Sequence, residues 1–287
     1  MTDRPHVPPV AASRVPLPTD ARTLPALPVV FHDILDRALA GIDLDLTPGM
    51  REAIDAQARL LLAWAPVVNL TAIRDPEGIA LEHVVDSLAA VPLLLDRLAS
   101  RRPPRRPVGL LDLGSGAGYP GLPVAIAIPV ARVALVDSVT RKAAFLEAAV
   151  ASATRAVRAH GEEPVPGQVL AVRAEELGRM PGHRERWEVV TARAVAALPW
   201  LLELALPLVR PGGVFVAWKR DAGDGVFDAE LASAMPLVEA LGGDPSLTIA
   251  SVQMDGLRDH RLVFVGKRRT TPDRWPRRAR GRHLLLP

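Results

Sequence analysis

The segment best suited to bind a ligand is the glycine-rich turn of residues 112–121, Asp-Leu-Gly-Ser-Gly-Ala-Gly-Tyr-Pro-Gly. It lies between a short apolar run and a predicted helix, where open α/β sheets bind ligands, and its small residues let a ligand approach the backbone. Dinucleotide enzymes need a third glycine three residues after the second, a position that is Tyr119 in this chain. The spacing of Gly114, Gly116 and Gly118 therefore favours S-adenosylmethionine (SAM), which has no pyrophosphate; a tight turn without a ligand is the alternative.

Polar residues follow the next three predicted strands. Asp137 ends the second strand, where a carboxylate can accept hydrogen bonds from both ribose hydroxyls of a nucleoside; capping the next helix is its alternative role. Ala174 and Glu175 follow the third strand, where an adenine would lie. Arg193 follows the fourth strand, where it could pair with a phosphate, with the methionine carboxylate or in a surface salt bridge. Arg193 is thus a candidate positioning residue, and no catalytic residue is assigned.

The residue types that the chain lacks restrict its chemistry. It has no cysteine, which excludes disulfides, thiolate metal sites and thiol nucleophiles. Methylation of C5 of a pyrimidine usually needs a thiolate to add to the ring first, so that reaction is excluded. No metal site is predicted, because His32, His83, His160, His183 and His260 are scattered along the chain.

The first third of the chain predicts a helical unit over residues 29–100. Thr47 and Pro48 form an N-cap and first-turn pair, and apolar residues spaced as one helix face follow them. Asp75 and Pro76 form a second such pair, which opens a helical region to about Leu98. Residues 1–28 hold seven prolines and predict a disordered extension, and residues 101–107 predict a linker or exposed turn.

The periodicity then changes to short apolar runs that alternate with helical segments. The predicted strands cover residues 108–113, 131–136, 169–172, 188–191, 214–218, 247–252 and 262–265, and the predicted helices cover residues 140–160, 198–209 and 227–241. This alternation predicts an α/β fold with a mostly parallel seven-stranded sheet covered on both faces. The last two strands have no long helix between them, which predicts an antiparallel edge. The domain is expected to span residues 101–266.

Positive charge is concentrated at the end of the chain. Residues 267–287 hold eight Lys or Arg and one acid, a charge of +7, so the rest of the chain carries −4 within a total of +3. A basic tail on a mildly acidic body suits a phosphate-rich partner, although a solvated, disordered tail is the alternative. We find no signal sequence and no long apolar run in the sequence, which favours the cytoplasm and argues against a membrane partner.

Several segments, taken in order, resemble one protein family, the ribosomal RNA small-subunit methyltransferase G family, also called glucose-inhibited division protein B. The matching segments are residues 64–76 and 82–88, the glycine turn with its extension to Pro123, residues 135–138 with 141–146, residues 174–175 and 192–194, and residues 271–278. The chain departs from the family at Pro66, where asparagine is usual, and at Arg220, where glycine is common. Its final residues also lack the usual proline–lysine run.

The resemblance implies a Rossmann-like SAM-dependent methyltransferase domain behind a small helical unit. It implies methylation of N7 of one guanine in the decoding region of 16S ribosomal RNA, with the RNA or the small subunit as partner. By position, the SAM contacts fall on Gly114, Tyr119, Ala174, Glu175 and Arg193. We expect a monomer. The candidate RNA-binding residues are Arg141, Lys142, Lys219, Lys267, Arg268, Arg269, Arg277 and Arg278.

The chemistry is compatible with this expectation. N7 of guanine carries a free lone pair and no proton, so it can attack a methyl group directly if the atoms are aligned in line, without a covalent enzyme intermediate. Enzymes that methylate exocyclic amines typically carry a Pro-Pro-aromatic motif after the fourth strand, where this chain has Thr-Ala-Arg-Ala at residues 191–194. Two alternatives stay open: a SAM enzyme that acts on a small molecule or protein, and a non-catalytic RNA-binding factor for ribosome assembly.

Overall fold

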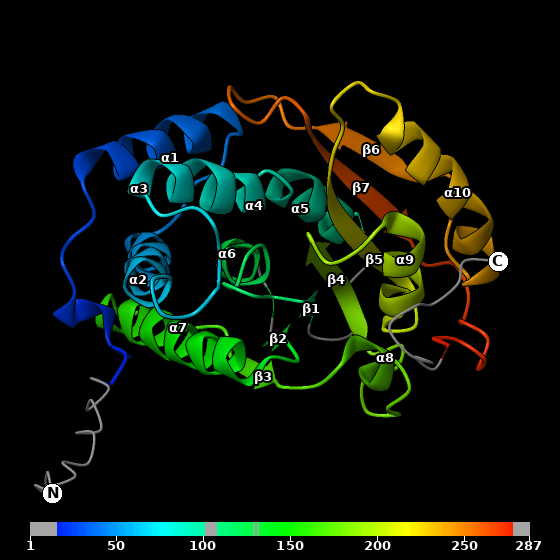
Figure 1. Cartoon of the computed structure of the whole chain (residues 1–287), viewed down its shortest axis with the longest axis horizontal. Coiled ribbons are helices and arrows are strands. Elements are labelled where there is room, and N and C mark those ends of the chain that lie inside the picture. The colour runs from blue at the N-terminus through cyan, green and yellow to red at the C-terminus, as the bar shows by residue number, and fades with distance from the viewer. Residues whose placement is uncertain (1–15, 101–107, 129, 131, 278–287) are drawn as a thin grey trace, which may run out of the picture.

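The computed structural model describes residues 16–100, 108–128, 130 and 132–277. In this part of the chain one seven-stranded sheet has the order β3-β2-β1-β4-β5-β7-β6 (Figure 1). The first five strands are mutually parallel, whereas β7 is antiparallel to both β5 and β6, so the predicted antiparallel edge is confirmed. The strands are β1 (Gly109–Leu113), β2 (Arg132–Val136), β3 (Gly167–Leu170), β4 (Trp187–Arg193), β5 (Val209–Arg220), β6 (Thr248–Ser251) and β7 (His260–Gly266).

The helices begin where the sequence predicts them. Thr47 caps α2 through its hydroxyl, which accepts from the backbone N–H of Met50 at 3.2 Å, and Asp75 caps the next helical run at Gly78. That run is α-helical at its ends and π-helical in the middle. The helical elements are η1 (Ala21–Thr23), α1 (Val29–Gly41), α2 (Pro48–Trp64), α3 (Pro76–Gly78), η2 (Ile79–Val85), α4 (Asp86–Leu88), α5 (Val91–Ala99), α6 (Gly121–Ala127), α7 (Thr140–Ala159), α8 (Ala174–Leu177), α9 (Leu198–Ala205) and α10 (Val226–Ala240).

The sheet separates two hydrophobic cores. Successive strand residues point to opposite faces, so Leu110 and Val189 pack with the helices from α1 to α7, while Leu111 and Val190 pack with α9 and α10. Figure 1 shows the first set of helices on one side of the sheet and α8, α9 and α10 on the other. Because every central strand is buried on both faces, the strands appear in the sequence as continuous apolar runs.

The prediction of a disordered N-terminal extension is wrong for residues 16–28. Ala21 is buried and its N–H donates to Ser152 Oγ at 3.2 Å, and Trp64 Nε1 donates to the carbonyl of Pro18 at 2.7 Å. These contacts attach the segment to α2 and α7. The proline-rich composition misled the prediction because the segment is held by side chains from distant helices and has little periodic structure of its own. Residues 1–15 lie outside the described residues.

The alternative of a solvated, disordered tail is wrong for residues 267–277. Lys267 is 3% exposed, and its ammonium donates to the carbonyls of Leu206 at 2.7 Å and Leu241 at 3.0 Å. Leu206 and Leu241 are the C-cap residues of α9 and α10. A cation at the C-terminus of a helix is stabilised by the last carbonyl groups and by the helix dipole. Trp275 packs into the second core.

The run Pro76–Ala99 has the length and hydropathy of a membrane-spanning helix, with a mean hydropathy of 1.6 in its most apolar window. However, 61% of that window is buried inside the fold. Its apolar side chains therefore belong to the core between the helical unit and the sheet. By length and composition alone, such a buried helix is weak evidence for a membrane span.

Candidate active site

The glycine loop, residues 114–118, follows β1 at the carboxyl edge of the parallel strands. Its three glycines all have positive φ angles, of 66° at Gly114, 54° at Gly116 and 82° at Gly118, a region that other residues adopt only with strain. A Cβ added to Gly116 would meet only the carbonyl of Gly114, at 3.8 Å. The space above Gly116 is therefore open, and a ligand can reach the backbone there.

The other two glycines are required by neighbouring protein atoms. A Cβ on Gly114 would lie 2.6 Å from Cγ2 of Val195, and one on Gly118 would lie 2.8 Å from Nε2 of Gln57. Gln57 is buried in α2 and donates to the carbonyl of Ala117 at 2.9 Å. The loop is thus packed between the helical unit and the β4–α9 turn, and only Gly116 leaves open space of the kind that the sequence suggested for all three.

Asp137 holds the glycine loop against β2. Its Oδ2 accepts from the N–H of Gly116 at 3.1 Å, and its Oδ1 accepts from the N–H of Val139 at 2.9 Å. The N-cap of α7 is Val139, so Asp137 is not the side-chain cap of that helix. Each carboxylate oxygen keeps a further acceptor position, which leaves the predicted hydrogen bonds to ribose hydroxyls possible. Ala174 and Glu175 begin α8 at the carboxyl end of β3, the strand beside β2.

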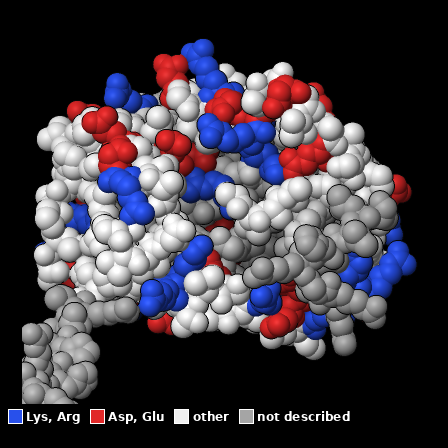
Figure 2. Space-filling view, in the orientation of Figure 1, with Lys and Arg blue, Asp and Glu red and all other residues white. Residues whose placement is uncertain are grey.

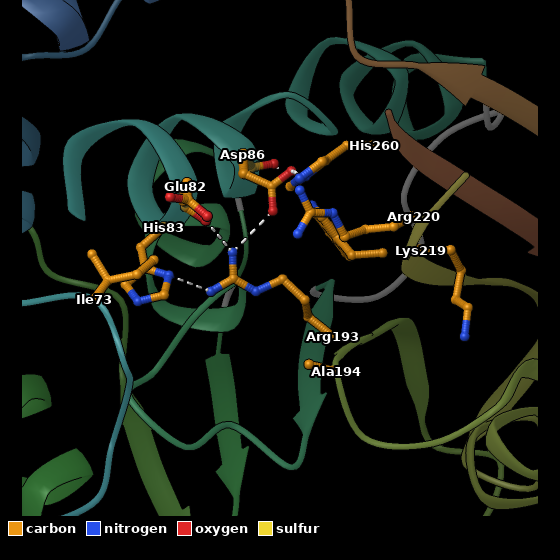
Figure 3. Close-up of a pocket in the computed structure, with 10 residues that line it drawn as sticks. Ile73, Glu82, His83, Asp86, Arg193, Ala194, Lys219, Arg220 and His260 are labelled. Carbon is orange, nitrogen blue, oxygen red and sulfur yellow. Dashed lines mark hydrogen bonds and ion pairs between the residues drawn. The ribbon is translucent and has the colours of Figure 1, made fainter. Parts of the chain in front are cut away.

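Arg193, the last residue of β4, is held by the helical unit. Its Nη1 donates to the carbonyl of Glu82 at 2.7 Å and to Asp86 Oδ2 at 2.9 Å, and its Nη2 lies 2.9 Å from His83 Nδ1 (Figure 3). A guanidinium only donates hydrogen bonds, so Nδ1 of His83 is the acceptor. The alternative of a surface salt bridge is excluded, because Asp86 is 1% exposed.

His83 is a neutral side chain in this arrangement. Burial lowers its pKa to about 4, and the Arg193 charge acts in the same direction. Its Nε2 then carries the proton and donates to Thr71 Oγ1 at 2.8 Å. The ring stacks on Tyr119 with centroids 5.0 Å apart. The Tyr119 side chain is consequently buried against His83, so any contact between this residue and SAM would be made by its backbone.

Asp112, at the end of β1, is fully buried beneath the loop. Its Oδ1 accepts from the hydroxyl of Thr191 at 2.7 Å. Burial raises its pKa to about 6, although the hydrogen bonds from Thr191 and Ser115 act against this rise. Gly121 must be a glycine, because a Cβ at that position would overlap the Asp112 side chain. The acid therefore supports the loop from below and is not exposed to a ligand on its outer side.

The sequence did not single out three side chains that complete the site. Asp86 Oδ1 accepts from His260 Nδ1 at 2.8 Å, and its carbonyl accepts from Trp218 Nε1 at 2.8 Å. The i,i+3 spacing of His83 and Asp86 on one helical face was the available signal; nothing local marks Trp218 or His260. These residues border a cavity of about 390 Å³ at the carboxyl ends of β4 and β5, lined by Ile73, Glu82, His83, Asp86, Arg193, Ala194, Trp218, Lys219, Arg220 and His260.

The candidate RNA-binding residues do not form one surface. Lys267 is buried, which contradicts its predicted contact with RNA. Arg277 is paired with Glu203 at 2.7 Å, and Glu203 is 0% exposed, so its guanidinium serves the fold. Arg268 pairs with Asp244 at 2.7 Å but is more than half exposed, and Arg269 donates to the Glu239 carbonyl. Arg278 lies outside the described residues.

The remaining candidates lie near the carboxyl edge of the sheet. Arg141 and Lys142 are in the first turn of α7, where Arg141 is exposed. Lys219 pairs with Glu230 at 2.5 Å and borders the cavity. Figure 2 shows Lys and Arg side chains, interspersed with acids, around a hollow on one face of the molecule. This distribution moves the expected RNA surface from the end of the chain to the edge that carries the glycine loop.

The sheet order, the loop after β1 and the acids after β2 and β3 define the class of protein. They fit SAM, because open space over Gly116 adjoins Asp137 and the chain offers acceptor groups on neighbouring strands. The fold is the Rossmann-like fold of SAM-dependent methyltransferases.

Comparison with known proteins agrees with this assignment of the fold. The model of the rRNA small subunit methyltransferase G family matches residues 50–226. Ribosomal RNA small subunit methyltransferase G of Symbiobacterium thermophilum is 36% identical over 250 residues, which are 87% of this chain and 95% of that protein. The protein of the same name from Roseiflexus sp. is 42% identical over 218 residues, 76% of this chain and 83% of that protein. The chain belongs to the rRNA small subunit methyltransferase G family, which confirms the predicted family, fold and SAM dependence.

Two solved structures show a weak similarity to this chain. The CurJ carbon methyltransferase is 15% identical, with 84% of this chain and 67% of that chain covered and a TM-score of 0.46. The branched-chain polyamine synthase of Thermus thermophilus is 17% identical, with 75% and 64% covered and a TM-score of 0.47.

Proposed function

We propose that this protein methylates N7 of a specific guanine in 16S ribosomal RNA and works as a monomer in the cytoplasm. Family membership supports a SAM-dependent rRNA methyltransferase. The finer proposal depends on the chemical character of the groups around Arg193. SAM, when bound, supplies an electrophilic methyl group, so the acceptor determines which further groups the site must provide.

The observation that carries N7 is the state of the side chains beside the glycine loop. Arg193 is a cation, and three of its five N–H donors are engaged by Glu82, His83 and Asp86. His83 is a weak base, with a pKa of about 4, and its Nδ1 lone pair is engaged by Arg193. Such groups are poorly suited to remove a proton from an acceptor. N7 of guanine needs no deprotonation: its lone pair forms the new N–C bond while the methyl–sulfur bond breaks and its electron pair stays on sulfur.

The chain's own residues would then act by binding and alignment. The backbone at Gly114, Gly116 and Gly118 and the side chains of Asp137 and Glu175 would hold SAM, with Tyr119 and Ala174 contributing backbone contacts. Arg193 would position the methionine carboxylate or an RNA phosphate. Alignment of two reactants can account for many kcal/mol of a reaction barrier, about 7–11 kcal/mol in favourable cases. A catalytic base is therefore not required for this reaction.

Arg141 and Lys142 would contact the RNA backbone and Lys219 would contact the RNA at the cavity, because all three lie at the edge where the acceptor must approach. Arg268 and Arg269 are exposed but lie beyond β7, so they would have at most a peripheral contact. The principal RNA-binding surface would therefore be the carboxyl edge of the sheet and not the end of the chain.

The proposal is tested by the choice of acceptor. Purified protein and methyl-labelled SAM are incubated with small ribosomal subunits, protein-free 16S rRNA, guanosine and a protein mixture. We expect labelling of subunits or rRNA, and none of guanosine or protein. Labelling of a small molecule or protein instead would favour a different SAM enzyme, and absence of any transfer would favour a non-catalytic assembly factor.

A further inference from the structure

We propose that the cavity at the carboxyl ends of β4 and β5 binds the target guanine after the base has left the RNA stack. This inference rests on the proposed function and adds the place where the acceptor is held. Among the cavities that the described residues form near the carboxyl edge of the sheet, two are candidate sites for a base. The first is the cavity of about 390 Å³ beside Arg193. The second has about 690 Å³ and lies between the N-terminal segment, α2 and α7.

The first cavity is next to the cofactor loop. Arg193 and Ala194 line it, and the next residue, Val195, occupies the space that a Cβ on Gly114 would need. Ala194 has a φ of +56°, which turns the chain sharply between the cavity and the loop. The cavity and the glycine loop therefore adjoin at the β4–α9 turn, and in-line attack requires that a base in the cavity reach the methyl group of a ligand on the loop past this turn.

The cavity walls have the chemistry of a nucleobase site. Ile73, Ala194 and Trp218 offer apolar surface, and flat bases pack well on such groups. Lys219 supplies an ammonium group with three hydrogens. It donates to Glu230 and to the carbonyl of Ala196. The third hydrogen can be donated to a carbonyl oxygen such as O6 of guanine. N7 itself must stay free for the methyl group.

The same walls are fixed in position before any base enters. Asp86 joins Arg193 of β4, Trp218 of β5 and His260 of β7 to the helical unit through hydrogen bonds of 2.8–2.9 Å. Figure 3 shows Asp86 between Arg193 and His260. A cavity held by four elements keeps its shape without a ligand, which lowers the ordering cost of binding a flipped base.

The charge around the cavity also suits RNA. Arg220 is 67% exposed and pairs with Asp259 at the surface, beside Lys219. Arg220 lies where the phosphates that flank a flipped nucleotide would approach. The second cavity has one charged lining residue, Arg141, and no lining residue from the β4–α9 turn. It is bordered by Pro16, Leu17, Trp64, Val67, Val68, Arg141 and Ala144.

Cross-linking provides a direct test. A 16S rRNA fragment that the wild-type protein methylates is prepared with 6-thioguanosine at the target nucleotide, irradiated in the complex and digested. We expect cross-links to the peptides with residues 73, 193–194 or 218–220. Cross-links confined to other peptides, such as residues 64–68 or 141–144, would overturn the proposal. So would a yield no higher than with thioguanosine at a neighbouring position.

Two tryptophan substitutions provide a matched test with activity. Ile73→Trp fills the proposed cavity and Val67→Trp fills the second, and both lie in the loop after α2. We expect Ile73→Trp to lower kcat/KM for RNA at least 100-fold with SAM affinity changed less than twofold, and Val67→Trp to stay within twofold of wild type. Equal effects, or the reverse order, would contradict the assignment. If Ile73→Trp does not fold, Lys219→Met replaces it with an expected tenfold loss.

The two proposals fail in distinguishable ways. If the wild-type product is not N7-methylguanine, the proposed function is wrong whatever the cavity binds. If the product is N7-methylguanine but neither cross-links nor variants point to this cavity, only the location of the base is wrong.

Discussion

Arg193 at the end of β4 and Asp86 in the helical unit form an ion pair of 2.9 Å, in which the acid is 1% exposed. The two residues are 107 positions apart in the sequence. The pair fixes the arginine beside the glycine loop, and it also fastens the helical unit to the sheet. The helical unit is therefore part of the candidate active site.

Asp86→Ala should strongly destabilise the fold. The substitution leaves the partly buried Arg193 and His260 without their acceptor, and removal of one partner of a buried pair typically costs about 3–5 kcal/mol. Urea denaturation measures the free energy of unfolding. Arg258→Ala is the matched control, because its pair with Asp255 is exposed on both sides and should contribute less than about 1 kcal/mol. Equal losses in the two variants would show that the Asp86 network has no special role in stability.

Gly116→Val should weaken SAM binding at least tenfold, about 1.4 kcal/mol, because its side chain would enter the open space above the loop. Isothermal calorimetry gives the affinity. Positive φ strains any substitution, so Gly161→Val serves as control: Gly161 has a φ of +74° and no atoms near its Cβ position, and it lies at the far end of α7. If both variants fold and bind SAM as the wild type does, the SAM site is not over Gly116.

Asp112→Asn should become more stable relative to wild type as the pH rises. The folded-state pKa of Asp112 is about 6, above the ordinary value near 3.9, so the folded wild type binds more protons between these values. Its free energy of unfolding therefore falls by about 2 kcal/mol from this group as the pH rises from 4 to 6. The opposite contribution of His83 is common to both proteins and cancels in the difference. Urea denaturation at pH 4, 5, 6 and 7 measures that difference; a difference independent of pH contradicts a buried, perturbed Asp112.

Arg277→Ala should destabilise the protein by about 3 kcal/mol, because it leaves the fully buried Glu203 unpaired. Arg268→Ala removes the same charge from an exposed pair with Asp244 and should cost less than about 1 kcal/mol. Thermal unfolding compares the two. A basic tail that serves only RNA would instead leave the stability of both variants unchanged and weaken RNA binding in both.

The fold could be predicted because its signals are local. Continuous apolar runs mark the central strands, and Thr47 and Asp75 mark helix starts by chemistry that acts within three residues. The loop glycines were found for the same reason. The reasons why individual glycines are required could not be predicted, because Gln57 packs on Gly118 and Val195 packs on Gly114 from distant parts of the sequence.

The errors concern residues whose partners are remote. Lys267 looks like part of a basic run, and only the tertiary structure shows that it caps α9 and α10 through Leu206 and Leu241. His260 has no local signal, because its role depends on the antiparallel pairing of β7 with β5, which brings it to Asp86. Charge counted along a sequence does not distinguish a cation that meets solvent from one that meets carbonyl groups inside the fold.

Methylation of guanine N7 in 16S rRNA can be tested by mapping the modified base. The gene is deleted, 16S rRNA is digested, and N7-methylguanine is located by mass spectrometry before and after incubation of the mutant subunits or rRNA with purified protein and SAM. We expect one N7-methylguanine to disappear from 16S rRNA when the gene is deleted. Incubation with the wild-type protein should restore it, whereas incubation with Gly116→Val should not. An unchanged N7-methylguanine content, or restoration of a methyl group on another atom, would contradict it.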